Sequence, residues 1–217
     1  MPKMRILLAS ASRRRQDWLQ KHLEYISDVS VSTRALLTEE TELIVGIDVG
    51  EQTEATCLFK ARAAVMEWII HSQSGEENPD YILVADTVVE DPDDSKVPLG
   101  KPINAASAAI MLLRLSDSRH RVWSSTAIIY PNDNRGSERL HGGWSADIWT
   151  ESALVEFEKL SEDNLVRLIE NNSWEGKAGA YDLAGPAGQF ATLIEGEEVT
   201  VLGLSPSAVR SLVQQLV

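Results

Sequence analysis

Apolar runs and amphipathic stretches alternate along the chain, and this alternation predicts an α/β fold. The short apolar runs at 6–8 and 81–85 predict buried strands, the second of them central to a sheet. Two helices are predicted by their starts, because Ser161 begins a capping pattern and Pro206 suits a first helical position. Three more follow from helical spacing of apolar residues, at about 12–23, 51–71 and 104–115.

The remaining apolar segments predict further strands. Polar, turn-forming residues at 90–95 and 131–138 predict hairpin turns between them. The predicted strands lie at 26–32, 120–130, about 143–157 and, as a short pair around an acidic turn, 191–203.

The predicted helix at 51–71 carries apolar residues at helical spacing, including Ala55, Phe59, Met66 and Ile70. Lys60 lies on the other side of this stripe. A lone lysine in such a place usually faces solvent, so we expect Lys60 at the surface on pattern alone.

Length and composition bound the class of protein. The 217 residues suit one large domain or two small lobes, and no apolar run reaches membrane-spanning length. The sequence predicts no signal peptide. Cys57 is the single cysteine, so no internal disulfide forms, and this fits a reducing cytoplasm. We expect Cys57 to be a small buried hydrophobe.

Acidic residues outnumber basic ones. Lys and Arg number 20 and Asp and Glu number 33, which gives a net charge of −13. Non-specific nucleic-acid binders need a basic field, so we expect no nucleic-acid partner. An anionic ligand would need a local cation cluster, where each contact is worth about 4 kcal/mol at an effective dielectric near 20. Alternatively, a divalent metal could bridge carboxylates to the anion.

The N-terminal strand leads directly into a candidate anion site. Ser10 and Ser12 follow the strand, and Ser12 suits a helix N-cap ahead of Arg14 and Arg15. The free N–H groups of a helix start attract anions, and forked guanidinium groups match phosphate oxygens. A solvated basic turn is the alternative interpretation of the same residues.

Asp86 follows the apolar run at 81–85, where a carboxylate is costly unless it is paired or binds a metal. We interpret it either as a turn residue or as a metal ligand or base at the carboxyl end of a strand. Lys101 follows the bend at Gly100, and Lys177 lies in a glycine-rich stretch at 172–188 that could cradle phosphate or form a tight loop.

Five short motifs in order resemble the Maf family of septum-formation-inhibitor-like nucleotide pyrophosphatases, and the likeness covers nearly the whole chain. The motifs are Leu-Ala-Ser-Ala-Ser-Arg-Arg-Arg at 8–15, Ala-Asp-Thr-Val-Val at 85–89, Leu-Gly-Lys-Pro at 99–102, the His120-x-Val122 strand start, and Gly-Lys-Ala-Gly-Ala-Tyr at 176–181.

The resemblance implies an α/β fold. The expected architecture is a single elongated domain over 1–217, with a mixed curved sheet, flanking helices, two lobes and a central cleft, related to inosine triphosphate pyrophosphatases. It also implies hydrolysis of a nucleoside triphosphate to a monophosphate and pyrophosphate, with a divalent cation such as magnesium or manganese. Members are often dimers, so the resemblance extends to a homodimer.

The resemblance also assigns residues. The family's catalytic aspartate falls on Asp86, and its second metal-site carboxylate falls on Glu40, with Glu39 as the alternative because the match is loose there. The substrate-binding positions fall on Ser10, Arg14, Arg15, Lys60, Thr87 (beside the base) and Lys101.

The sequence departs from the family pattern at two positions, of which only the second bears on specificity. Arg13 stands where proline is usual, and Ala184 stands where a polar residue would read the base. A methyl group cannot hydrogen-bond a base edge, so the preferred base is open. Three functions follow: a house-cleaning pyrophosphatase for pyrimidine (dTTP/UTP) or modified nucleotides, which we favour; a pyrophosphatase for a methylated guanine nucleotide; or a non-catalytic nucleotide-binding regulator of cell division.

Overall fold

A computed structural model describes residues 4–38, 46–73, 75 and 77–217. Its eight strands form one mixed sheet in the order β2-β1-β3-β5-β7-β6, with β4 on β3 and β8 on β7. The first two pairs are parallel, and the others are antiparallel. The strands are β1 (Met4–Leu8), β2 (Val29–Thr33), β3 (Tyr81–Asp91), β4 (Asp94–Leu99), β5 (Ser118–Tyr130), β6 (Glu138–Arg139), β7 (Ser145–Phe157) and β8 (Ala191–Glu195).

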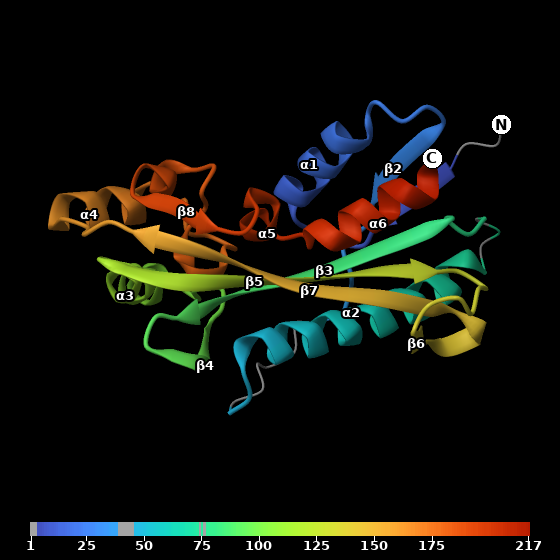
Figure 1. Ribbon diagram of the computed structural model, residues 1–217, viewed down its shortest axis with the longest axis horizontal. Helices are drawn as coiled ribbons and strands as arrows, with labels where there is room; N and C mark the ends of the chain where they lie inside the picture. Colours follow the sequence, from blue (N-terminus) through green and yellow to red (C-terminus); the bar gives the residue numbers. More distant parts are fainter. Residues whose placement is uncertain (1–3, 39–45, 74, 76) are drawn as a thin grey trace.

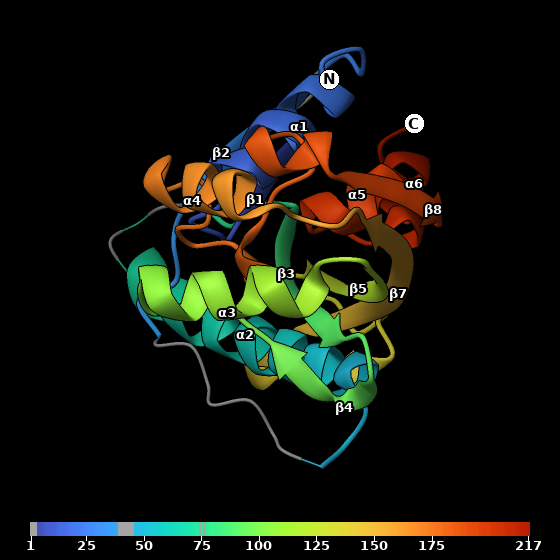
Figure 2. The same ribbon diagram turned by 90° about the vertical axis from the view of Figure 1, so that its left-hand side faces the viewer.

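Helices cover both faces of the sheet and one end of it (Figures 1 and 2). The long helix α2 (Val49–Ser72) lies on one face, and α1 (Arg13–Leu23) and α6 (Pro206–Leu216) lie on the other. At the far end, α3 (Ala105–Leu115) and α4 (Glu162–Glu170) pack around the tips of β5 and β7. A short helix, α5 (Glu198–Leu202), and three 3-10 turns complete the chain: His141–Gly143, Ala178–Ala180 and Pro186–Gln189.

The apolar run in β3 is buried on both sides, as its sequence predicts. Ile82 and Val84 pack with Ala61 and Val65 of α2, whereas Leu83 packs on the opposite face. There Leu19 and Leu23 of α1 and Leu212 of α6 join it. Helices therefore pack against both faces of this one central strand.

Side-chain caps fix the predicted helix starts. The Ser12 hydroxyl accepts the Arg15 N–H, and the Ser161 hydroxyl accepts the Asn164 N–H. Asn104 and Ser107 form a reciprocal capping box at the start of α3. Pro206 lies in the first turn of α6, also as predicted.

Two predicted elements are wrong. The strand expected at 81–85 continues to Asp91, so Asp86 lies inside β3 rather than at its end. The reason is that β5 pairs with β3 from Ile82 to Val89 and β4 takes over as a second neighbour. The second strand expected in 191–203 is the helix α5, because a short apolar run does not by itself distinguish helix from strand.

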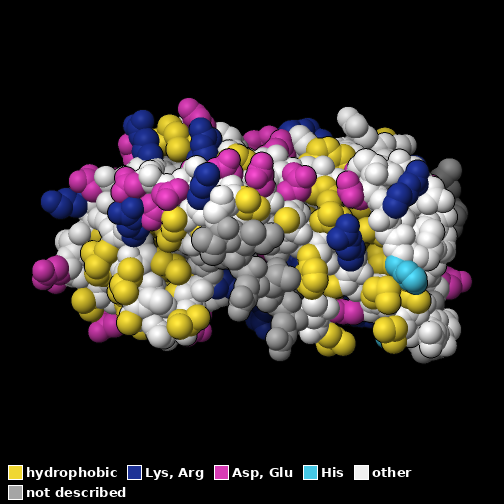
Figure 3. Space-filling model, turned by 90° about the horizontal axis from the view of Figure 1, so that it is seen from below, with side chains coloured by type: hydrophobic (Ala, Val, Ile, Leu, Met, Phe, Trp, Pro, Cys, Tyr) yellow, Lys and Arg dark blue, Asp and Glu magenta, His cyan; other side chains and the backbone are white. Residues whose placement is uncertain are grey.

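The predicted apolar stripe of α2 is also wrong. Phe59, Met66 and Ile70 are exposed, and the face of the molecule that carries α2 shows apolar side chains at its surface (Figure 3). The buried residues facing the sheet are instead the small Cys57, Ala61 and Ala64, with Val65 and Trp68. Apolar residues surround the helix on all sides, so their spacing does not identify the packed face. Within the described residues, no helix is long and apolar enough to cross a membrane.

Candidate active site

The candidate site lies at a gap in the sheet. β1 pairs with β3 only as far as Leu83, and β4 begins its pairing at Val89. In the pairing of the described strands, 84–88 of β3 therefore has no neighbour on that edge, although β5 lies on the other. A cavity of about 540 Å³ opens there, between the start of α1, the middle of α2 and the loop after α4. This volume is within the range of ligand sites.

The gap is filled in part by Arg15. Its guanidinium donates to the Ala85 carbonyl (Nη1, 3.1 Å), the Gly203 carbonyl (Nε, 2.8 Å) and the Thr87 hydroxyl (Nη2, 2.8 Å). A longer bond of 3.4 Å reaches the Ser10 hydroxyl. These four acceptors within the described residues are neutral oxygens, so these bonds orient the guanidinium.

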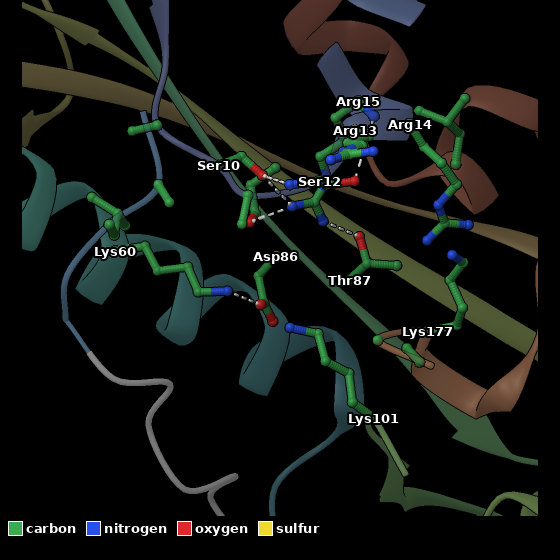
Figure 4. A pocket seen from close by; sticks show the side chains of 18 of the residues that line it. Ser10, Ser12, Arg13, Arg14, Arg15, Lys60, Asp86, Thr87, Lys101 and Lys177 are labelled. Carbon is green, nitrogen blue, oxygen red and sulfur yellow. Dashed lines mark hydrogen bonds and ion pairs between the residues drawn. The ribbon is translucent and has the colours of Figure 1, made fainter. Parts of the chain in front are cut away.

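Asp86 is the carboxylate at the centre of the cavity. Because side chains alternate along a strand, Asp86 faces α2, where the Lys60 ammonium lies 2.6 Å from Oδ1. Lys60 and Lys101 point toward Asp86 from different sides (Figure 4). Asp86 Oδ2 is buried and has no hydrogen-bond partner among the described atoms. Such an atom is costly unless a ligand, proton or metal completes it.

The cavity's other wall comes from the start of α1 and the loop after α4. Arg14 Nη1 lies 3.0 Å from Oδ1 of Asp182, and Lys177 Nζ lies 3.9 Å from Oδ2. Arg14 and Lys177 lie side by side on this wall (Figure 4). Asp182 thus holds two cations at the edge of the cavity, one from each segment.

Buried aromatic groups support this loop. The Tyr181 ring lines the cavity, and its hydroxyl lies 2.8 Å from Nε2 of His120. Burial lowers the pKa of His120 to about 4, so its ring is neutral at pH 7. Burial raises the pKa of Tyr181, so its hydroxyl stays protonated. The pair therefore adds no charge to the cavity.

The structure brings most of the expected site residues together. Ser10, Arg14, Arg15, Lys60, Asp86, Thr87 and Lys101 all line the cavity. Ala184 does not: it is exposed, and its backbone N–H donates to Asp182. Glu40, expected at the metal site, and its alternative Glu39 lie outside the described residues. Lys60 faces the cavity rather than open solvent, against the expectation from its helical position.

Cys57 lies where the sequence predicts, whereas three other residues have no role assigned from the sequence. Cys57 is fully buried, and burial raises its pKa to about 12, which matches the expected inert hydrophobe. Sequence reasoning missed Asp182 and Ser124, because their partners are distant in the chain. It noted Lys177 but gave it no role, and its glycine-rich surroundings were the available signal.

The described residues fit a divalent cation only in part. They contain no group of three or more His, Cys, Asp or Glu side chains that could hold a metal. Asp86 supplies one buried oxygen without a partner, which suits a cation that takes its remaining ligands from water and phosphate. Glu175 is the second carboxylate on the described lining.

The charge of the cavity indicates its ligand. The described lining carries six cations against two carboxylates: Arg13, Arg14, Arg15, Lys60, Lys101 and Lys177 against Asp86 and Glu175. Guanidinium and ammonium groups in a partly buried cavity suit a polyanion, and a central carboxylate suits proton transfer or metal binding. The arrangement fits a phosphate-bearing ligand.

Comparisons with known proteins show the family of the chain. A sequence model of the family described as Maf-like protein matches residues 5–216. A dTTP/UTP pyrophosphatase of Pyrococcus abyssi (strain GE5 / Orsay) is 31% identical over 212 residues, covering 96% of this chain and 95% of that protein. A dTTP/UTP pyrophosphatase of Shouchella clausii (strain KSM-K16) is 30% identical over 200 residues, with 91% and 88% coverage.

Two further similarities are partial or distant. A dTTP/UTP pyrophosphatase of Ruegeria sp. (strain TM1040) is 36% identical over 138 residues, and the match spans 63% of this chain and 64% of that protein, just under two thirds of its length. Among solved structures, a nucleoside-triphosphatase / dITP/XTP pyrophosphatase from Mycobacterium abscessus aligns over 98% of this chain and 96% of that one. It has 16% sequence identity and a TM-score of 0.43.

Proposed function

The chain belongs to the Maf-like protein family, and from this premise we propose that it is a nucleoside triphosphate pyrophosphatase. The proposed substrates are dTTP, UTP or modified nucleotides, and the products are the monophosphate and pyrophosphate. One observation carries the proposal: Asp86, buried and with one oxygen unpartnered, lies in the same cavity as six cations. The names of the relatives, dTTP/UTP pyrophosphatase, support the choice of substrate.

The residues on the β3 side of the cavity would perform the chemistry. Lys60 holds Oδ1 of Asp86 at 2.6 Å and so leaves Oδ2 for the reacting water. Asp86 would take a proton as water attacks the α-phosphorus. The bond from that phosphorus to the bridging oxygen breaks, and the electron pair leaves with pyrophosphate.

The cations would bind the triphosphate and stabilise the leaving group. Arg15 presents a guanidinium fixed by protein oxygens, and Lys101 points into the cavity from the other side of Asp86. Preorganised charges of this kind act where charge develops in the transition state. Arg14 and Lys177, held by Asp182, would contact the far end of the ligand.

A magnesium or manganese ion belongs to the same proposal. In this alternative Asp86 Oδ2 would hold the ion instead of taking the proton, with Glu40 as the second carboxylate from outside the described residues. When bound, such an ion polarises phosphate oxygens and lowers the pKa of a coordinated water.

A pyrophosphate-release screen tests the proposal. We expect purified protein with magnesium or manganese to release pyrophosphate from dTTP and UTP in preference to purine nucleotides. Release from a methylated guanine nucleotide alone would replace the favoured substrate with the second candidate. Binding without release from any nucleoside triphosphate would replace the enzyme with the nucleotide-binding regulator.

The remaining family properties are proposals as well: one domain over 1–217 with two lobes, a cytoplasmic location, no nucleic-acid partner, and a homodimer. Light scattering coupled to size-exclusion chromatography tests the last of these. A mass near the 23.9 kDa of one chain would contradict the homodimer.

A further inference from the structure

The hydroxyl of Thr87 lies within a buried chain of hydrogen bonds. Thr87 neighbours Asp86 on β3 but faces the opposite side of the sheet, toward α1 and α5. Its pairing partner on β5 is Ser124, and the two hydroxyl oxygens lie 2.9 Å apart. Ser124 is fully buried, and its hydroxyl donates to the Thr200 carbonyl at 2.7 Å.

The direction of each bond follows from the number of protons. A serine hydroxyl has one proton, and a carbonyl can only accept. Because Ser124 gives its proton to Thr200, it accepts from Thr87. Thr87 therefore uses its own proton on Ser124 and accepts from Nη2 of Arg15 at 2.8 Å. The Thr87 hydroxyl has no second proton to donate to a nucleotide base.

The turn after α5 is shaped for the Arg15 guanidinium. Gly203 has a φ of +120°, and a Cβ there would lie 2.7 Å from Nε of Arg15 and 3.0 Å from Oγ1 of Thr87. The Gly203 carbonyl accepts from the same Nε at 2.8 Å. Any side chain at this position would enter the space that Arg15 and Thr87 occupy.

We infer that Thr87 and Ser124 are positioning residues that hold the Arg15 guanidinium at the triphosphate site. This inference rests on the proposed function and deepens it. Ser124 does not line the cavity, so its effect on a ligand must pass through Thr87 and Arg15. Through Arg15, the Thr87 hydroxyl then affects how firmly the phosphates are held, whichever base the nucleotide carries.

Thr87→Val and Thr87→Ser form the matched test. Valine keeps the shape of threonine and removes the hydroxyl, whereas serine keeps the hydroxyl. We expect Thr87→Val to lower kcat/KM about 10- to 100-fold for all substrates in parallel, because one bond to a charged group is lost. Thr87→Ser should stay within about threefold of wild type. Ser124→Ala should resemble Thr87→Val.

A control variant separates this effect from the general loss of a hydroxyl in β5. The Ser118 hydroxyl donates to the Leu115 carbonyl, away from the cavity. Ser118→Ala should leave kinetics unchanged. A change in Thr87→Val confined to one base, or kinetics equal to wild type, would overturn the inference, because the hydroxyl would then read the base or have no role.

A spectroscopic readout needs no turnover. A guanidinium held by several acceptors rotates slowly, so in ¹⁵N NMR spectra we expect resolved Nε and Nη signals for Arg15 in the wild type and in Thr87→Ser. The Nη signals should broaden in Thr87→Val and Ser124→Ala. If no nucleotide is hydrolysed by the wild type, the proposed function fails while this measurement still tests the positioning. Signals unchanged in Thr87→Val would overturn it.

Discussion

Two cavities of opposite charge lie close together in this protein. The first holds six cations and two carboxylates in its described lining. The second is an acidic groove along the start of α2. Among the residues that the structure describes there, it holds five carboxylates and one cation: Asp48, Glu51, Glu54, Glu90 and Glu138 with Arg121. α2 and β3 contribute to both, with Lys60 and Asp86 in the first and Glu54 and Glu90 in the second. The net charge of −13 for the whole chain therefore does not indicate the charge of either cavity.

The two cavities also differ in how far their charged side chains are exposed to solvent. In the first, the side chains of Lys60 and Asp86 are 17% and 11% exposed, and Arg15 is held by four protein acceptors. In the acidic groove, Glu51 and Glu54 are exposed, although Arg13 and Lys101 at the rim of the first cavity are exposed as well. Salt at physiological concentration screens interactions between exposed charges beyond about 8 Å, whereas it screens partly buried charges much less. The comparison indicates that the burial and fixed orientation of charged side chains, more than the number of charges, suit a cluster to ligand binding.

The largest expected effect comes from comparing two carboxylates of one strand, one inside the basic cavity and one outside it. Asp86 and Asp91 are both buried in β3, and both pair with a cation, Lys60 and Arg114 respectively. Only Asp86 lines the basic cavity. We expect Asp86→Asn to keep the fold and lower kcat about 10²- to 10⁴-fold, the range for loss of a general base. Steady-state kinetics measures kcat, and circular dichroism checks that the fold is kept.

Asp91→Asn is the matched control. Arg114 donates two bonds to Asp91 and holds the pKa of that carboxyl below its usual range. We expect turnover within about threefold of wild type and a loss of about 1–2 kcal/mol in the free energy of unfolding. If Asp91→Asn lost turnover as Asp86→Asn does, burial of a paired carboxylate would matter rather than its position in the cavity.

Much of the fold could be read from the sequence. Serine and asparagine caps fixed where α1, α3 and α4 begin, because capping is a local interaction. The apolar run of β3 was readable for the same reason, but its extension to Asp91 depends on β4 and β5, which lie elsewhere in the chain. The helix α5 was missed because five residues give too little periodicity.

The sequence predicts most of the residues that line the cavity, but it does not predict how they are arranged there. The sequence singles out Asp86 as a carboxylate beside an apolar run. It predicts that Asp86 lies at the end of the strand, whereas Asp86 lies inside it. Lys60 was expected in solvent, because apolar residues surround α2 and conceal its packed face. Ser124 and Asp182 gave no signal, since an ordinary polar residue becomes part of a site only through a partner in another segment.

The second prediction tests whether the basic cavity gains a seventh cation on acidification. His120 lies behind Tyr181, facing its hydroxyl and the Phe157 ring. Burial lowers the pKa of His120 to about 4 in the folded state, against an ordinary histidine value of 6.5. The unfolded chain therefore binds more protons between pH 6.5 and 4, and stability falls as pH falls through this range. The pKa difference corresponds to about 3 kcal/mol at pH 4.

His120→Gln removes this titration. We expect the free energy of unfolding, measured with urea at pH 7 and pH 4, to fall by about 3 kcal/mol less in the variant than in the wild type. His141 is exposed, so His141→Gln should follow the wild type. Equal acid losses in wild type and His120→Gln would mean that His120 is protonated in the folded state and adds charge beneath the cavity.

The smallest expected effect compares one charge from each cavity. Lys101→Gln removes a cation from the first, and Glu51→Gln removes a carboxylate from the acidic groove. The two changes have the same size and opposite sign. We expect Lys101→Gln to raise KM for the nucleotide about 10-fold at 0.15 M salt, as for a lost charge-assisted hydrogen bond.

Glu51→Gln should change KM less than about twofold at this salt, because Glu51 is exposed and lies about 13 Å along α2 from Lys60, beyond the Debye length. At 0.02 M salt its effect should grow, whereas the effect of Lys101→Gln should persist at both salt concentrations. Measurement of KM for each variant at the two salt concentrations separates direct contact with the nucleotide from the long-range electrostatic field of the protein. Equal shifts from the two variants at 0.15 M would mean that the overall field sets affinity, and the distinction between the two cavities would fail.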